Sequence, residues 1–264
     1  QTIALFFMIG MGVFGQGFVG KLAFPSANVS DRLEKTFTSV NFNMMIMVIY
    51  ALITIAIFGM WYYARYEGNF LPSPKKTFNP MMLVAIVILV PGTQFAANFI
   101  ANLTGYIRPD WMQQYNELFE TSGITDTTFV TVLYSVILAP ICEELIFRGV
   151  TMRCARKALP FALANLMQAA LFGLFHLNWI QGIYAFALGI VLGYVCERGG
   201  SIYYSMGLHL LFNLWGTLSG FFRDPGNSVV VFVIVIAVTI VSLVVGFVLF
   251  NKGRRKLPIN STGI

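Results

Sequence analysis

The sequence predicts an all-α fold, a polytopic membrane helical bundle with about eight transmembrane helices. Hydrophobic residues make up 57% of its 264 positions and charged residues only 11%, and the mean hydropathy is +0.74. Because soluble domains carry about 25% charged residues, this composition places most of the chain in lipid. Eight apolar stretches are long enough to cross about 30 Å of hydrocarbon as helices. They lie near residues 2–24, 41–64, 79–103, 126–147, 160–178, 181–197, 201–222 and 228–250.

The connections between these stretches are mostly short, which predicts a single integral membrane domain over residues 1–264. The first stretch is longer than the roughly 7 to 15 residues of a signal-peptide core, so we expect a retained helix. The two longest connections are 25–40 and 104–125. The second carries Trp111 and Tyr115 beside acidic residues, which favours a position along the membrane interface.

Positive charges are distributed unevenly between the two sides of this threading. If the first stretch runs from inside to outside, twelve of the 17 Lys and Arg residues fall on the inner side and five on the outer side. The positive-inside rule then predicts that both termini are cytoplasmic. The net charge of +6 is mainly a topology signal, and a nucleic-acid partner has little support. The three cysteines fall at inner-side positions, where thiols stay reduced, so no disulfide framework is expected.

An acidic pair lies in the fourth apolar stretch. Glu144 precedes Arg148 by four residues, the favourable order for an ion pair on one helix face. Glu143 points about 100° away from Glu144, so one carboxylate is expected to be neutralised and the other to stay free. Pro140 removes a backbone hydrogen bond and is expected to open the helix beside them. The plainer alternative is a pair of interfacial acids near the cytoplasmic end.

The chain contains only two histidines, and each lies in an apolar stretch. Phe172 and His176 share a helix face at i,i+4, so the phenyl ring is expected to restrict the imidazole, and Gly173 leaves room for another helix. His209 and Asn213 share a face in the same way and present two N–H donors, which suits stabilisation of an oxyanion. The alternatives are a core histidine bonded to a backbone carbonyl and a polar clasp between helices.

Ionisable side chains in hydrocarbon cost a few kcal/mol each, so they tend to face a partner or a water-filled cavity. We therefore expect the helices between residues 126 and 222 to bring these groups to one wet pocket within the bilayer. Straight vertical helices do not align them, because His176 lies about 24 Å and His209 about 12 Å along their helices. Tilt, a half-length fifth helix with a later entry into the membrane, or a funnel dipping from the cytoplasm would reconcile the two depths.

The three motifs together resemble those of the CAAX protease and bacteriocin-processing family of intramembrane endopeptidases, which includes the Ras-converting type II CAAX protease. The resemblance is to EExxxR at Glu143, Glu144 and Arg148, to FxxxH at Phe172 and His176, and to HxxxN at His209 and Asn213. All three patterns are complete and in the family's order over about 70 residues. Three such patterns in order are far more specific than any one of them.

The resemblance implies a glutamate-dependent endopeptidase in which a buried water attacks a peptide carbonyl. It implies that Glu143 is the general base, assisted by His176, and that His209 and Asn213 form the oxyanion hole. Glu144 and Arg148 would brace the site. The implied substrate is a membrane-associated peptide or lipidated protein, such as a prenylated CAAX-type peptide, near the cytoplasmic leaflet.

Several alternatives to this mechanism stay open. No cofactor is expected, but Glu143, His176 and His209 with a water are also the ligand set of a catalytic zinc site. A thiol mechanism would need Cys142, which projects about 100° from Glu143. A non-catalytic scaffold or regulator of the same family is a further candidate, although a scaffold has no need of three intact motifs. A transporter would show broken helices in matching halves of an internal repeat, and we find none in the sequence.

Overall fold

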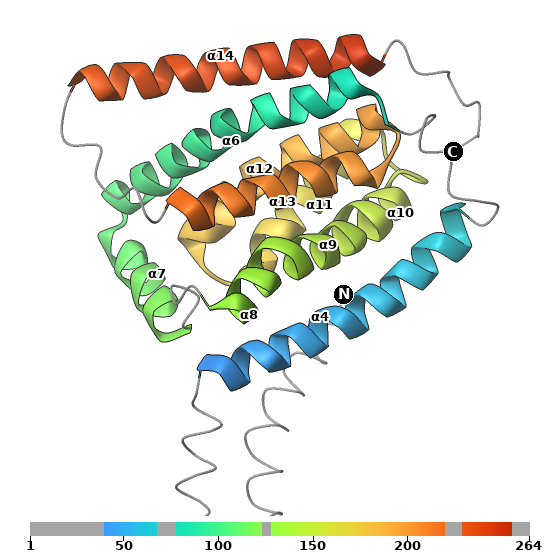
Figure 1. Ribbon diagram of the computed structural model, residues 1–264, viewed down its shortest axis with the longest axis horizontal. Coiled ribbons are helices and arrows are strands. Elements are labelled where there is room, and N and C mark those ends of the chain that lie inside the picture. Colours follow the sequence, from blue (N-terminus) through green and yellow to red (C-terminus); the bar gives the residue numbers. More distant parts are fainter. Residues whose placement is uncertain (1–39, 68–77, 123–127, 220–228, 255–264) are drawn as a thin grey trace, which may run out of the picture. The chain divides into compact units, whose positions relative to one another are not determined.

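The computed structural model describes residues 40–67, 78–122, 128–219 and 229–254. Every regular element in these ranges is helical, so the all-α prediction is confirmed. The chain divides into two units, Gln1–Tyr50 and Ala51–Ile264. The second unit contains all six candidate site residues, and its helices are drawn in Figure 1.

The predicted apolar stretches correspond closely to observed helices. The first of them, near 2–24, lies outside the described residues. The stretch predicted near 126–147 extends further, as one helical run from Phe129 to Ala155. The elements are α4 (Val40–Tyr62), η1 (Tyr63–Glu67), α6 (Pro80–Ile107), α7 (Pro109–Ser122), α8 (Phe129–Val132), η2 (Leu133–Leu138), α9 (Ala139–Glu144), η3 (Leu145–Met152), α10 (Arg153–Ala155), α11 (Phe161–Phe175), α12 (Trp179–Gly199), α13 (Ile202–Ser219) and α14 (Val229–Arg254), where η denotes a π-helical turn.

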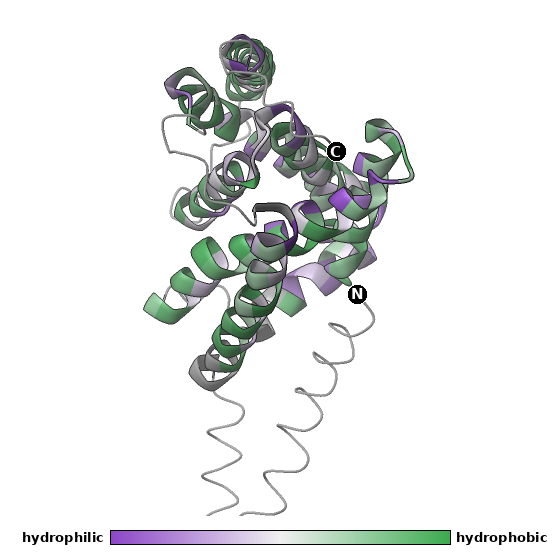
Figure 2. Cartoon of the chain, turned by 90° about the vertical axis from the view of Figure 1, so that its right-hand side faces the viewer, coloured by the Kyte–Doolittle hydropathy of each residue, from purple (hydrophilic) through white to green (hydrophobic). Residues whose placement is uncertain are grey.

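Five helical runs are long and apolar enough to cross a membrane, which is the pattern of a multi-pass membrane protein. Large hydrophobic side chains are exposed along these runs, above all on α14, as expected of surfaces that face lipid. Figure 2 shows the same predominance of hydrophobic residues along the helices. The five runs are Ile46–Arg65, Pro80–Ile107, Phe129–Ala155, Trp179–Gly199 and Val229–Arg254.

Helix α11 is shorter than the predicted fifth stretch. It has 15 residues and ends at Phe175, and His176 is its C-cap. At 1.5 Å per residue it is about 22 Å long, less than the hydrocarbon thickness. Because α11 begins at Phe161, as predicted, His176 still lies about 22 Å along it, so a half-length helix with a later entry is not what the structure contains.

A hydroxyl group joins α14 to a proline-containing turn of α6. Pro91 has no N–H to donate and disturbs the regular backbone pairing around it. The N–H of Gly92 donates to Oγ of Ser242 at 2.9 Å, and the Ser242 hydroxyl donates to the carbonyl of Ile88. A Cβ on Gly92 would lie 2.7 Å from Oγ of Ser242, so the close approach of α14 to α6 requires glycine at this position. Backbone groups that lipid would leave unpaired are thereby satisfied, and α14 lies along α6 (Figure 1).

Asn79 joins the beginning of α6 to two other helices. Its side-chain oxygen accepts from the N–H of Met81 and caps α6, and its amide donates to the carbonyl of Gly253 on α14. Its backbone N–H donates to the hydroxyl of Tyr204 on α13 at 2.8 Å. An Asn N-cap satisfies helix donors that would otherwise be unpaired, so this one residue fixes three helix ends.

The main core lies between α6, α12 and α13 and continues to α14. Leu89, Leu192, Leu208 and Phe250 are fully buried representatives from these four helices. This core holds α12 and α13 in place; α13 carries His209 and Asn213, and α12 supplies the backbone carbonyl of Gly189.

Helices α11 and α12 form a close antiparallel hairpin. A Cβ on Gly173 would lie 2.5 Å from the carbonyl oxygen of Gly182, and one on Gly193 would lie 1.9 Å from Oδ1 of Asn165. Such small residues let membrane helices approach closely. Because the backbones are so near each other, polar side chains of α11 reach backbone carbonyls of α12.

Candidate active site

The glutamate pair lies on α9, a six-residue α-helical stretch between the π-helical turns η2 and η3. At the end of η2 the N–H of Ala139 donates to the carbonyl of Tyr134, five residues earlier. Pro140 follows this widened turn, as expected from its missing donor. Single π-helical turns inside α-helices are frequent at functional sites, and here they occur on both sides of Glu143 and Glu144.

Glu144 and Arg148 form a fully buried ion pair. Nη1 of Arg148 donates to Oε1 of Glu144 at 2.8 Å, and neither side chain is exposed. The pair has the i,i+4 spacing seen in the sequence, and the two charges compensate each other away from water.

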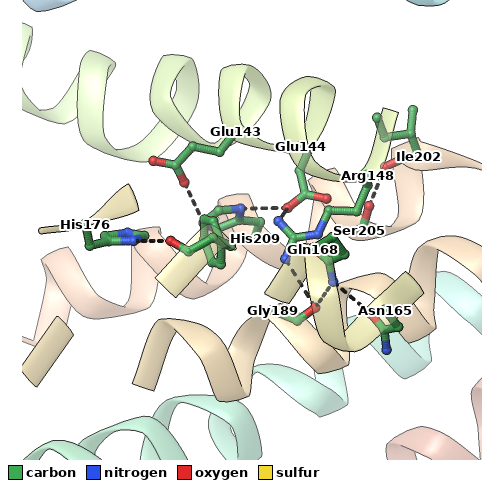
Figure 3. Close-up of polar contacts among 11 residues, drawn as sticks. Glu143, Glu144, Arg148, Asn165, Gln168, His176, Gly189, Ile202, Ser205 and His209 are labelled. Atoms are coloured by element: carbon green, nitrogen blue, oxygen red, sulfur yellow. Dashed lines mark hydrogen bonds and ion pairs between the residues drawn. The ribbon is translucent and has the colours of Figure 1, made fainter. Parts of the chain in front are cut away.

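His209 lies between the two glutamates, as Figure 3 shows. Its Nδ1 donates to Oε1 of Glu144 at 2.9 Å, and its Nε2 lies 3.5 Å from Oε2 of Glu143. The imidazole is 3% exposed whereas Glu143 is 18% exposed, so Glu143 is the more accessible of the two acids. Both carboxylates of α9 therefore contact one ring of α13, and each contacts a different nitrogen.

A ladder of hydrogen bonds extends from Arg148 into the α11–α12 hairpin. Nη2 of Arg148 and Nε2 of Gln168 both donate to the carbonyl of Gly189, at 3.2 and 2.9 Å. Nε2 of Gln168 also lies 2.8 Å from Oδ1 of Asn165, whose amide donates to the carbonyl of Ile190. The guanidinium is thereby held from two sides, by Glu144 and by a carbonyl of α12 (Figure 3).

The ring of Phe172 separates the two histidines and touches both. Its centroid lies 4.9 Å from that of His176 and 5.8 Å from that of His209, each in an edge-on arrangement. The guanidinium carbon of Arg148 lies 4.6 Å from the same ring centroid. Cations and ring edges are favourable neighbours of an aromatic ring, so Phe172 acts as a common spacer for the site.

His176 donates from Nδ1 to the carbonyl of Phe172 at 2.8 Å. A carbonyl oxygen can only accept, so this contact places a proton on Nδ1 and leaves Nε2 of the neutral ring as an acceptor. This hydrogen bond is the one expected of a core histidine, and it also fixes the orientation of Nε2, the nitrogen that can accept a proton. Leu177, the next residue, has φ 54°, the only positive φ of a non-glycine residue in the described chain.

Asn213 donates from Nδ2 to the carbonyl of Ser135 in η2 at 2.8 Å. This bond joins α13 to the widened turn that precedes the glutamates, as a clasp between helices would. A primary amide has two N–H groups, so one further donor remains.

The structure brings Glu143, Glu144, Arg148 and His209 into one connected cluster. His176 adjoins it through the Phe172 ring, and Asn213 lies on the helix of His209, one turn further along. Cys142 packs instead with Ile146, Phe147 and Phe172 in an apolar cluster. In the described ranges, no three His, Cys, Asp or Glu side chains are grouped closely enough to hold a metal ion.

Sequence reasoning did not identify Asn165, Gln168 or the carbonyl of Gly189. The signal was present, because Asn165 and Gln168 are two amides at i,i+3 in an apolar stretch, and such residues commonly bond across membrane helices. Their partner is a backbone group of the next helix, which no side-chain motif reveals.

Residues 125–215 match the model of a protein family described as Type II CAAX prenyl endopeptidase Rce1-like. The matched residues include all six site candidates, from Glu143 to Asn213. The chain thus contains an Rce1-like type II CAAX prenyl endopeptidase domain, and the family resemblance inferred from the three motifs is confirmed. A domain of this family favours proteolysis of a protein or peptide within the membrane. Comparison with curated proteins and with solved structures finds no significant match to this chain.

Proposed function

We propose that this protein is a glutamate-dependent intramembrane endopeptidase in which Glu143 activates a water molecule. The observation that carries the proposal is the placement of His209 between Glu143 and Glu144, with a different ring nitrogen toward each. General-base catalysis needs a carboxylate that can reach the water. Glu143 is partly exposed, whereas Glu144 is fully buried and paired with Arg148.

Glu143 is the proposed base because its carboxylate is the more exposed of the two and has no arginine partner among the described residues. His176 would hold the same water, since its Nδ1–H is committed to the carbonyl of Phe172 and its Nε2 can accept a proton. Figure 3 shows His176 and the carboxylate of Glu143 on the same side of His209. Two acceptors near one water would orient it and draw off its proton.

Glu144 and Arg148 would position His209 rather than react. Glu144 accepts from Arg148 and is held ionised, so the Nδ1 of His209 that donates to it carries a proton. A second proton on Nε2 would make the ring an imidazolium between two carboxylates. The cluster of these four side chains would then have no net charge, which lowers the cost of burying it.

The proposed reaction is a hydrolysis of one peptide bond. The water oxygen attacks the carbonyl carbon while Glu143 accepts a water proton, and the carbonyl electron pair moves to oxygen. The Nε2–H of His209 and the remaining amide N–H of Asn213 would donate to this oxyanion, and preorganised donors of this kind lower the barrier substantially. The C–N bond then breaks, the carbonyl re-forms, and the proton on Glu143 passes to the leaving amine.

The proposed substrate is a membrane-associated peptide or a lipidated protein, with a prenylated CAAX-type peptide as the first candidate. Five apolar helices offer lipid-facing surface, and in the described ranges no soluble module large enough to recruit a folded partner is present. Both termini are proposed to be cytoplasmic, from the distribution of Lys and Arg.

The test is a cleavage assay in liposomes with a prenylated CAAX-type peptide, the same peptide without the lipid, and a peptide library. Wild-type protein is compared with Glu143→Ala and His176→Ala, with and without a chelator. We expect cleavage by the wild type only, insensitive to the chelator. Unchanged turnover in both variants would defeat the mechanism, loss of wild-type turnover on chelation would favour the zinc-dependent alternative, and a folded wild type without activity on any peptide would favour the scaffold.

A further inference from the structure

A groove of about 480 Å³ lies on a lipid-facing surface formed by α11, α12 and α14. Its lining is almost entirely apolar, and its volume is within the range of about 300 to 1,000 Å³ that is usual for small-molecule sites. Apart from Asn165 and Ile190, which end the hydrogen-bond ladder from Arg148, no lining residue takes part in the candidate active site. They are Phe161, Ala162, Asn165, Leu166, Ile190, Val191, Tyr194 and Phe247.

The groove lies toward one end of its three helices. Phe161 is the first residue of α11, whereas Tyr194 and Phe247 lie in the C-terminal parts of α12 and α14. On the predicted topology this end faces the cytoplasm, because α11 runs outward and α12 and α14 run inward. The groove therefore begins at the level of the inner headgroups and extends into the hydrocarbon.

Tyr194 connects the groove to two basic side chains. Its ring lies 5.4 Å from that of Phe247 within the groove, and its hydroxyl donates to Oδ1 of Asn251 at 2.9 Å. The guanidinium carbon of Arg198 lies 5.7 Å from the Tyr194 ring centroid, and Lys252 directly follows Asn251. Arg198 thus lies beside the inner end of the apolar groove, and the exposed Lys252 follows the residue of α14 that Tyr194 contacts there.

The charge at this end is not neutralised by nearby acids. Glu197 is the acidic residue closest in sequence to Arg198, and it pairs with Arg156 at 3.2 Å. In the described part of the chain, no carboxylate forms an ion pair with Arg198 or Lys252. The net positive charge is left facing the headgroup layer.

We infer that this groove binds an anionic glycerophospholipid of the inner leaflet. One acyl chain lies between α11, α12 and α14, and the phosphate contacts Arg198 and Lys252. Basic residues between membrane helices on the cytoplasmic side are suited to anionic headgroups, and each cation near the surface contributes about fivefold to affinity. The charge complementarity distinguishes this site from the nonspecific apolar surface of α14. The inference rests on the proposed topology and not on the proposed catalytic activity.

The inference is tested by native mass spectrometry of the full chain, purified in detergent and delipidated. The protein is incubated with phosphatidylglycerol or with phosphatidylcholine of the same acyl chains, and the lipid-bound fractions are compared. We expect the wild type to bind phosphatidylglycerol at least tenfold more tightly. Equal binding of the two lipids would overturn the inference.

Two pairs of variants locate the site. Arg198→Gln with Lys252→Gln should remove the preference for phosphatidylglycerol, whereas Arg65→Gln, an exposed cation of η1, should keep it. Ala162→Trp fills the groove from an exposed position and should reduce binding of both lipids, whereas Leu163→Trp, also exposed but outside the lining, should not. A preference that survives the double substitution, or equal effects of the two tryptophans, would contradict the assignment.

Discussion

Glu144 and His209 are 65 residues apart in the sequence and meet through a hydrogen bond of 2.9 Å inside the protein. This bond joins α9 to α13 and determines which nitrogen of the imidazole faces Glu143. Because Arg148 holds Glu144 through the same oxygen, the orientation of His209 depends on a charge that is itself buried. The proposed chemistry therefore rests on three contacts, Arg148 with Glu144, Glu144 with His209, and His209 with Glu143, and each can be tested separately.

Removal of the buried cation should destabilise the fold strongly. Arg148→Met leaves the buried Glu144 without its arginine partner, and breaking a buried ion pair costs about 3–5 kcal/mol. The free energy of unfolding in detergent is the measurement. Arg156→Gln is the matched control, since its pair with Glu197 is 20% and 28% exposed and should contribute less than about 1 kcal/mol. Equal losses in the two variants would contradict the role assigned to Arg148.

A methyl group at Gly193 should also destabilise the protein. In Gly193→Ala the new Cβ would lie 1.9 Å from Oδ1 of Asn165, so α11 and α12 must separate or the Asn165–Gln168 contact must break. Overpacking of this kind costs about 1–3 kcal/mol. Gly207→Ala is the control, because nothing lies within 4 Å of its Cβ position, and its unfolding midpoint should not fall. A variant at Gly193 as stable as the wild type would show that the hairpin is looser than described.

Loss of the amide at Asn213 should lower kcat more than it changes KM. Removal of one oxyanion donor typically costs about 10²–10³-fold in kcat, and Asn213→Ala should show a loss of that order. Thr217→Ala is the control, because Thr217 donates to the carbonyl of Asn213 on the same helix and has no proposed catalytic role. If Asn213→Ala lowers only the stability and leaves kcat unchanged, the residue is a clasp to Ser135 and not an oxyanion donor.

Loss of the imidazole at His176 should reduce turnover with little effect on folding. His176 lies at the partly exposed C-terminal end of α11, and its Nδ1 bonds only to a carbonyl of its own helix. General acid–base assistance contributes about 10²–10⁴-fold, so His176→Ala should lose at least 100-fold in kcat. Leu177→Ala, at the adjacent exposed position, should keep most of the activity. Comparable losses in the two variants would point to the turn itself rather than to the imidazole.

Much of the fold could be predicted because lipid imposes simple rules on sequence. The third apolar stretch was predicted near 79–103 and is found at Pro80–Ile107, and charges inside apolar stretches pointed directly to the Glu143 and His209 region. The end of α11 at Phe175, three residues before the predicted end at 178, could not be predicted, because it depends on the turn at Leu177 and not on hydropathy. The bonds of Gln168 to Gly189 depend on how closely two helices pack, which side-chain spacing does not encode.

The central claim is that Glu143 acts as the base while Glu144 does not. It is tested most directly by kcat for Glu143→Gln in liposomes, beside Glu197→Gln as a control glutamate on α12. Glutamine keeps the size of the side chain and removes its basicity, so the account predicts at least a 100-fold loss in kcat for Glu143→Gln, an unchanged unfolding midpoint, and near wild-type kcat for Glu197→Gln. A folded Glu143→Gln variant that cleaves at the wild-type rate would contradict it.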